Sequence, residues 1–224
     1  MLSLTGVFNL LAQADSVKMI QYTPDFRFED GIYLSFSQLK NNNPIPKSRL
    51  ITEVDYSDRD FFENVLDNKY IYFYDQFGMR QEIRTEDIWG FSRNGVPFIA
   101  MDDGYYRITV IGTICHFVAT VTTYDTRYHD PYYYNPYYYN SYNRYGGYYP
   151  STYASSEMRQ YILDFETGNL LEYDVGSLEV LLMKDPELHD EYSQLRRKKK
   201  RQLKFLYLRK FNERNPLYIP VQSY

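Results

Sequence analysis

A tyrosine-rich stretch between Tyr124 and Tyr153 limits the folds open to this chain more than any other feature. It contains thirteen of the 27 tyrosines and a near-tandem repeat of (Asp/Asn)-Pro-Tyr-Tyr-Tyr-Asn. Several of its residues block regular backbone pairing, namely Pro131, Pro136, Pro150, Gly146 and Gly147. A connection of about 30 residues is far longer than usual, and such segments are typically functional or disordered. We therefore predict a loop insertion over residues 124–156.

The composition of this insertion favours contact with a partner. Tyrosine joins a flat apolar ring to a polar tip at a small cost in conformational entropy, and it is common on binding surfaces. The predicted contact residues are Tyr132, Tyr133, Tyr134, Tyr137, Tyr138, Tyr139, Tyr142 and Tyr145. Two alternatives stay open beside a protein partner. The insertion is compatible with a glycan-binding module that stacks tyrosines on sugars, and with a low-complexity segment that has no specific role.

The alternation of apolar and polar residues predicts an antiparallel β-meander that starts near residue 69. Strands are expected at 70–74, 79–83, 88–92, 96–101, 105–111, 113–123, 158–165 and 169–173. Asn94-Gly95 is a strong signal for a tight hairpin. Upstream, Ser57 or Asp58 is expected to cap a short helix that runs through Leu66. The insertion would then join two neighbouring strands as an overlong hairpin connection.

The C-terminal part, residues 177–215, is expected to be helical. Ser177 is expected to cap a first helix, and Asp185-Pro186 combines an N-cap carboxylate with proline at the first helical position. The stripe that follows consists of Leu188, Tyr192, Leu195, Leu203 and Leu206, interrupted by Lys199. Strands first and helices last indicate an α+β fold. We expect an antiparallel meander sheet or open barrel with a C-terminal basic amphipathic helix.

This helix concentrates positive charge. The formal net charge of the chain is −4, but residues 184–214 carry +6 and the remainder carries −10. The predicted contact residues here are Arg196, Arg197, Lys198, Lys200 and Arg201. They suit an acidic protein, anionic lipid or polysaccharide. The alternative is a solvated helix face, or one docked on the chain's own acidic sheet with the stem of Lys199 buried.

The N-terminus predicts export. Leu2–Ala12 is apolar, and Ala12-Gln13-Ala14 places small residues where a signal peptidase cleaves. We therefore predict a signal peptide at residues 1–14 and a single β-rich domain at residues 15–224, in the periplasm or associated with the outer membrane. A short buried helix at the N-terminus is the alternative. Export makes nucleic acid an unexpected partner, and no transmembrane span is expected because no apolar run is long enough.

No pattern in the sequence specifies a catalytic or metal site. Cys115 and His116 are adjacent on a predicted strand, so they point to opposite faces and cannot form a catalytic dyad. The acidic run between Glu53 and Glu63 lacks the glycine and glutamate of a calcium loop. We expect no metal, no cofactor and no enzymatic activity. A hydrolase with an unrecognised carboxylate pair remains open, and it would show as two acids with perturbed pKa values in one pocket.

Several stretches resemble exported proteins of unknown function from Bacteroidota. They are Asp30-Gly-Ile-Tyr-Leu-Ser-Phe with Asn42-Asn43-Pro44, Glu86-Asp-Ile-Trp89-Gly-Phe with Asn94-Gly95, Tyr105-Tyr-Arg-Ile, Lys184-Asp-Pro-Glu-Leu, and Tyr207-Leu-Arg-Lys-Phe-Asn-Glu-Arg-Asn-Pro-Leu-Tyr218. The resemblance covers most of the chain outside the insertion. It implies a cell-envelope location and a single domain, and it implies no catalytic residue. The function expected from these observations is a non-enzymatic envelope interaction or accessory protein.

Overall fold

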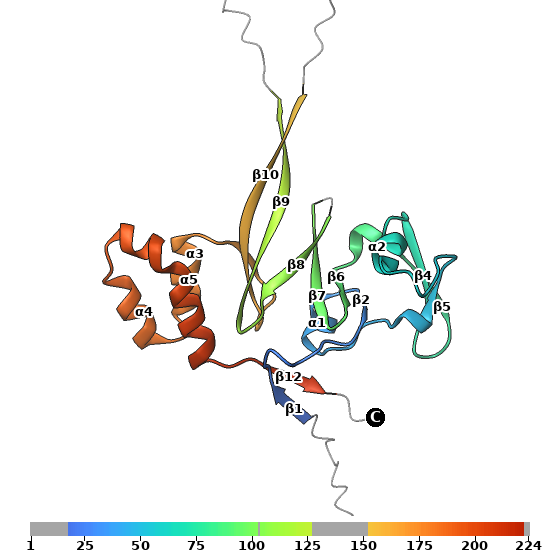
Figure 1. The fold of residues 1–224 in the computed structure, drawn as a ribbon, viewed down its shortest axis with the longest axis horizontal. Coiled ribbons are helices and arrows are strands. Elements are labelled where there is room, and N and C mark those ends of the chain that lie inside the picture. Colours follow the sequence, from blue (N-terminus) through green and yellow to red (C-terminus); the bar gives the residue numbers. More distant parts are fainter. Residues whose placement is uncertain (1–17, 103, 127–151, 222–224) are drawn as a thin grey trace, which may run out of the picture.

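The computed structural model describes residues 18–102, 104–126 and 152–221, and these residues form an α+β fold (Figure 1). The fold combines antiparallel strands with helices, the main sheet stays open, and the longest helix lies near the C-terminus. The predicted fold class is therefore confirmed. The predicted signal peptide, residues 1–14, lies outside the described residues.

The largest sheet has seven antiparallel strands in the order β11-β10-β9-β8-β7-β6-β2. They are β2 (Gly31–Tyr33), β6 (Gly90–Arg93), β7 (Val96–Met101), β8 (Gly104–Val110), β9 (Ile114–Thr126), β10 (Thr152–Asp164) and β11 (Leu170–Glu172). From β6 to β11, sequence neighbours are sheet neighbours, as a meander requires. Asn94 and Gly95 both have positive φ, 53° and 72°, which is the conformation of a tight two-residue turn and confirms that hairpin.

The first two strands predicted for the meander belong to a different sheet. β4 (Tyr70–Tyr74) and β5 (Arg80–Arg84) pair with β3 (Leu50–Ile51). The side chains of β4 pack into a separate apolar cluster with the phenylalanines of α2 (Phe61–Leu66). A 3-10 turn, η2 (Thr85–Asp87), then separates β5 from β6. The continuous meander therefore begins at β6, because among the described strands β5 pairs only with β4 and the η2 turn interrupts the chain before β6.

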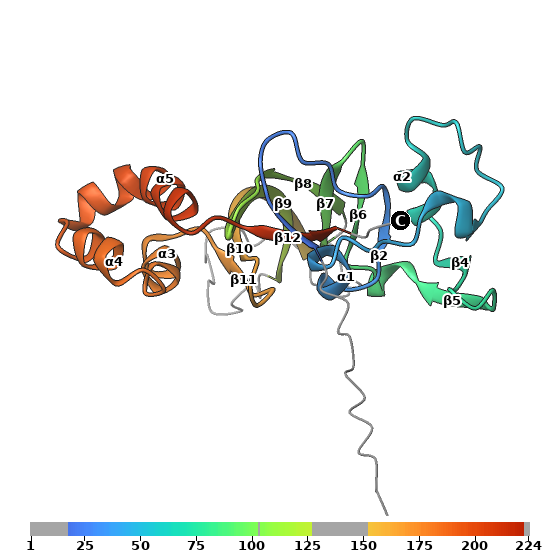
Figure 2. The same ribbon diagram turned by 90° about the horizontal axis from the view of Figure 1, so that it is seen from below.

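Two apolar clusters lie on opposite faces of β9 and β10. Cys115 and Leu163 belong to a cluster that includes Leu39 of α1 (Phe36–Lys40) and Ile219 of the C-terminal strand β12 (Tyr218–Val221), which pairs with β1 (Lys18–Gln21). Ile114 and Ile162 face the C-terminal helices. Successive strand residues point to opposite faces, so this part of the sheet has cover on both sides (Figure 2).

Three helices make up the C-terminal layer: α3 (Val175–Leu182), α4 (Pro186–Ser193) and α5 (Arg197–Arg214). Asp185 caps α4 as predicted, accepting a hydrogen bond of 3.1 Å from Leu188 N, with proline in the first turn. The cap of α3 is Asp174, which accepts from Ser177 N at 2.7 Å. The predicted cap at Ser177 is therefore three residues too late, because the aspartate before the helix supplies the acceptor.

The apolar stripe after Asp185 does not run along one helix. The chain leaves the helix at Gln194 and re-enters it at Arg197, so that Tyr192 of α4 packs against Tyr207 of α5 with ring centroids 4.8 Å apart. Leu206, predicted to lie in the stripe, is exposed. None of the described helices is long and apolar enough to cross a bilayer.

Candidate interaction surface

The insertion begins and ends at the tip of a long hairpin. β9 and β10 pair residue by residue over thirteen positions, from Ile114–Asp164 to Thr126–Thr152. The strands therefore extend into the ends of the predicted insertion, 124–156, and the connection between them is residues 127–151. High β-propensity at the valine, threonine and tyrosine positions of these strand ends accounts for the extension.

The outer part of this hairpin projects beyond the sheet (Figure 1). We define the arm as residues 118–126 and 152–160, which lie beyond Phe117 and Tyr161, the last residues paired with β8 and β11. Phe117 and Tyr161 stack with centroids 5.6 Å apart in a buried cluster, so the base of the arm is fixed. Tyr106 Oη adds a hydrogen bond of 2.8 Å to Thr120 O.

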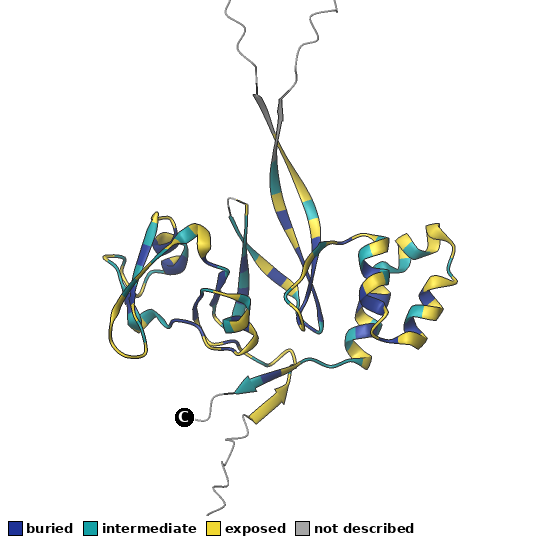
Figure 3. Cartoon of the chain, turned by 180° about the vertical axis from the view of Figure 1, so that it is seen from behind, coloured by how far each residue is buried: buried dark blue, intermediate teal, exposed yellow. Residues whose placement is uncertain are grey.

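One face of the arm carries exposed apolar side chains. Val118 is 40% exposed and Met158 is 80% exposed, on the face of the sheet that also carries His116. Figure 3 shows exposed positions along the arm beyond its buried base. The eight predicted tyrosine contacts lie outside the described residues: Tyr132, Tyr133, Tyr134, Tyr137, Tyr138, Tyr139, Tyr142 and Tyr145.

The basic run at the start of α5 divides into outward and inward side chains. The exposed members are Arg196, Arg197, Lys198, Lys199 and Arg201, and none forms an ion pair with a described residue. Lys200 differs, because its ammonium lies 2.7 Å from Glu179 Oε1 and its side chain is only 13% exposed. It is engaged within the chain, so the outward basic surface consists of the other five.

Three cations further along α5 are engaged within the chain, whereas Arg209 is exposed. Lys204 Nζ donates to Tyr173 O at 2.6 Å and lies over the Tyr173 ring. Lys210 pairs with Glu191 at 2.9 Å, and Arg214 pairs with Asp185 at 2.7 Å. These contacts hold α5 against α3 and α4. The sequence did not indicate these ion pairs, because Glu191 of α4 and Asp185 at its N-cap lie far along the chain from Lys210 and Arg214.

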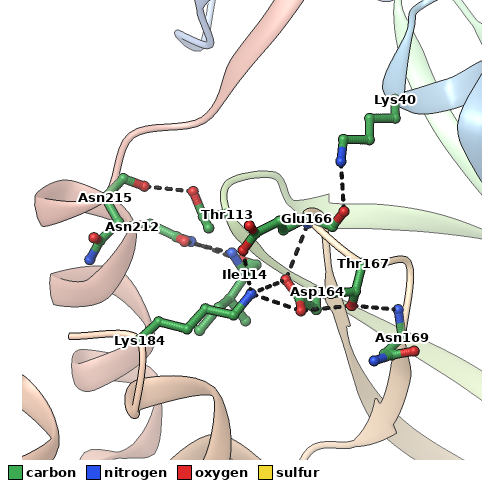
Figure 4. A network of polar contacts seen from close by, with 10 residues as sticks. All are labelled: Lys40, Thr113, Ile114, Asp164, Glu166, Thr167, Asn169, Lys184, Asn212 and Asn215. Carbon is green, nitrogen blue, oxygen red and sulfur yellow. Dashed lines mark hydrogen bonds and ion pairs between the residues drawn. The ribbon is translucent and has the colours of Figure 1, made fainter. Parts of the chain in front are cut away.

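A buried carboxylate joins the sheet to the helices (Figure 4). Both oxygens of Asp164, at the end of β10, lie 2.9 Å from Lys184 Nζ, and Thr167 Oγ1 donates to it at 2.7 Å. Burial opposes its ionisation, but these hydrogen bonds and that from Glu166 N outweigh the effect and lower the pKa of Asp164. The contact fixes the end of α3 to the sheet. Nothing in the sequence marked this aspartate.

Cys115 and His116 occupy opposite faces of β9, as expected for adjacent strand residues. Burial raises the pKa of the Cys115 thiol to about 12, so the thiolate is not populated at neutral pH. Burial lowers the pKa of His116, although its 3.1 Å hydrogen bond with Gln160 partly offsets the effect. The His116 ring packs edge-on against Tyr173 and Phe205.

The acidic run near α2 is engaged in local hydrogen bonds and ion pairs. Asp58 accepts from Asp60 N at 2.9 Å and from Asn64 Nδ2 at 2.8 Å, so it organises the turn before α2. Asp60 directly precedes α2 without a side-chain cap, which corrects the predicted cap at Ser57 or Asp58. Arg93 pairs with Asp60 and Glu63.

Carboxylates of the described residues do not form a cluster that could hold a metal, although Glu29 and Asp30 both line a cleft of about 270 Å³. No group of three or more His, Cys, Asp or Glu side chains that could hold a metal occurs among them. The carboxyl groups whose pKa values are shifted are all shifted downward: Asp55, Asp75, Asp164, Asp174, Asp185 and Glu191. A cleft of about 530 Å³ beside the end of α5 contains a single carboxylate, Glu213.

Comparison with models of protein families, with curated proteins and with solved structures finds no match to this chain. The arm and the start of α5 are therefore the two candidate contact surfaces of the described residues.

Proposed function

We propose that this protein is a non-enzymatic interaction protein of the cell envelope, which binds a protein partner through its tyrosine-rich insertion. The observation that carries the proposal is the register of β9 and β10, which pair through Thr126 and Thr152. This register brings both ends of the insertion to the tip of the arm. Thr126 and Thr152, the residues that flank the insertion, thus lie at the outer end of the arm, away from the buried base at Phe117 and Tyr161.

The proposed location is the periplasm or the outer membrane. Support comes from the apolar segment Leu2–Ala12 followed by Ala12-Gln13-Ala14, the pattern of a cleavable leader, and from the resemblance to exported Bacteroidota proteins. Fractionation of the native cells, followed by N-terminal sequencing of the recovered protein, tests it. A mature chain that begins at Asp15 in an envelope fraction is the expected result, and an uncleaved cytosolic chain would contradict it.

The function itself is tested by affinity capture from solubilised envelopes with three chains. The first is intact, the second has residues 127–151 replaced by a short Asn-Gly turn, and the third keeps the length but has serine at the eight predicted tyrosines. We expect the intact chain to retain one stoichiometric protein that both variants lose. Equal capture by all three chains would contradict a role for the insertion.

The glycan-binding alternative has a separate readout. Soluble envelope polysaccharide would then change the tyrosine fluorescence of the intact chain but not that of the serine variant, because stacking a sugar on the rings alters their surroundings. Under the protein-partner proposal, polysaccharide leaves both spectra unchanged.

A further inference from the structure

The first turn of α5 is positively charged, whereas negative charge is what stabilises the N-terminal end of a helix. Arg197, Lys198 and Lys199 begin the helix, no acidic residue lies in the first turn, and the N-cap residue Arg196 makes no side-chain capping bond. The N-terminal end of a helix carries partial positive charge, so anions stabilise it and cations do not. An anionic surface outside the chain would relieve this repulsion.

Large apolar side chains lie exposed among these cations. Phe205 is 42% exposed and Leu206 is 48% exposed. Seven residues make almost two helical turns, so Phe205 lies on the same stripe as Lys198, and Leu206 lies on the same stripe as Lys199. Arg209, one turn beyond Phe205, is also exposed and forms no ion pair with a described residue.

We define the outer face of α5 by five exposed residues: Lys198, Lys199, Phe205, Leu206 and Arg209. The opposite side of the helix is buried through Tyr207, Leu208 and Phe211. Figure 2 shows α3 and α4 lying on one side of α5. At one edge of the outer face, the Phe205 ring packs edge-on against His116 of β9, and Arg209 lines the cleft beside Val110 and Gly112. Lys198, Lys199 and Leu206 are exposed and form no hydrogen bond, ion pair or ring contact with a described residue. The face therefore combines three exposed cations with two partly exposed apolar side chains along more than two helical turns, and a single exposed carboxylate, Glu213, lies one turn beyond Arg209.

We propose that the outer face of α5 binds the surface of an anionic lipid bilayer. The helix would lie in the plane of the headgroups, with Phe205 and Leu206 entering the interface while Lys198, Lys199 and Arg209 contact lipid phosphates. Cations alone suit any polyanion, but exposed aromatic and leucine side chains between them suit a surface with hydrocarbon beneath charged headgroups. The inference goes beyond the proposed function, because it requires neither the insertion nor a protein partner.

The test is cosedimentation of the full chain with vesicles of phosphatidylglycerol and phosphatidylcholine in equal amounts, compared with phosphatidylcholine alone. One variant carries Lys198→Glu, Lys199→Glu and Arg209→Glu. A charge-matched control carries Arg59→Glu, Lys69→Glu and Arg107→Glu, at exposed positions in the β-sheet part. A third variant carries Phe205→Ser and Leu206→Ser. All chains share the same N-terminal segment, so differences between them report on α5.

We expect the intact chain to bind anionic vesicles and not neutral ones. Reversing the three α5 charges should weaken binding at least about 100-fold, since each basic residue near an anionic leaflet contributes about fivefold. It should not lower stability, because glutamates in the first turn suit the helix end. The charge-matched control should bind within about threefold of the intact chain. The serine variant should bind about tenfold more weakly.

Three results would overturn the proposal. The first is absence of binding to anionic vesicles at low salt. The second is equal loss in the charge-matched control, which would make net charge the cause. The third is full vesicle binding by the Phe205→Ser, Leu206→Ser variant together with competition by soluble polyphosphate, which would make α5 a general polyanion site.

Discussion

At the scale of single residues, Asp164 and His116 show how polar groups fix the sheet to the helices. Asp164 meets Lys184 at the end of the sheet, and His116 lies between β9 and the helical layer, against Tyr173 and Phe205. Both are buried polar groups with side-chain partners, and removal of a partner in such a place leaves a buried group unsatisfied. Each therefore gives a stability prediction.

We predict that Asp164→Asn lowers the free energy of unfolding by about 1–3 kcal/mol, because Lys184 loses its charged acceptor at a buried position. Glu166→Gln is the matched control. Glu166 also pairs with Lys184 but is exposed, so its loss should cost less than about 1 kcal/mol. Urea unfolding followed by Trp89 fluorescence measures both. Equal effects would mean that burial of Asp164 contributes nothing.

His116 predicts a pH dependence of stability. Its pKa in the folded chain lies below the ordinary value of about 6.5, so below pH 6.5 the unfolded chain takes up a proton that the folded chain does not. The contribution of uncharged His116 to stability is complete above that pH, and it is lost as the pH falls toward the pKa of His116 in the folded chain. We expect a smaller loss of stability between about pH 7.5 and 5.5 in His116→Gln than in the unchanged chain.

His189→Gln serves as the control for that experiment, since His189 lies on α4 near Asp190 and outside the contact with β9. A change in the pH dependence that occurs in His116→Gln and not in this control reports on His116. If His116→Gln retained the pH dependence of the unchanged chain in full, the shift in the pKa of His116 would be contradicted.

At the scale of elements, α5 has one face that stabilises the fold and one that does not. Phe211 is fully buried in the cluster between the helices and the sheet, whereas Leu206 is exposed. We predict that Phe211→Ala costs about 3–5 kcal/mol and that Leu206→Ala stays within about 0.5 kcal/mol. Denaturant unfolding of both variants tests this. Comparable costs would contradict the assignment of Leu206 to the outer face.

The hairpin β9–β10 should fold without the insertion. Its base is held by Phe117 and Tyr161, and the strands pair as far as Thr126 and Thr152. Replacing residues 127–151 by a short Asn-Gly turn is expected to leave stability unchanged or raise it by up to about 2 kcal/mol, because a shorter loop costs less entropy to close. Marked destabilisation of this variant would show that the insertion packs on the described fold.

Local signals in the sequence located most of these elements. Asn94-Gly95 predicted the hairpin turn correctly, because both residues adopt positive φ readily. Asp185-Pro186 predicted the start of α4 correctly, because the N-cap side chain and the proline both act within the first turn. The break between α4 and α5 was missed, because Gln194 and Leu195 are compatible with helix. The break allows Tyr192 to pack on Tyr207, a contact between positions fifteen residues apart that leaves no local pattern.

The candidate site was only partly accessible from sequence. Composition located the basic run, but it could not separate Lys200, which pairs with Glu179 on another helix, from the outward Lys198 and Lys199. The same limit applied to Asp164, since its partner Lys184 is twenty residues away. Partners supplied by tertiary packing leave no local pattern.

At the scale of the whole molecule, the two candidate contact surfaces, the arm and the outer face of α5, belong to different parts of the fold. The arm projects from one end of β9 and β10, while α5 lies in the helical layer that packs on the sheet face (Figure 1). A bilayer contact through α5 and a protein contact through the insertion use different elements. The two proposals therefore fail or succeed independently, and the variants above separate them.

The most direct test of the central claim is photo-crosslinking in the native cells from the insertion itself. A photoreactive phenylalanine analogue replaces Tyr134 in one chain and Tyr74, an exposed tyrosine of β4, in another. We predict that the analogue at position 134 forms one dominant adduct with an envelope protein and that the analogue at position 74 does not. No adduct from position 134, or the same adducts from both positions, would contradict the claim that the insertion binds a protein partner.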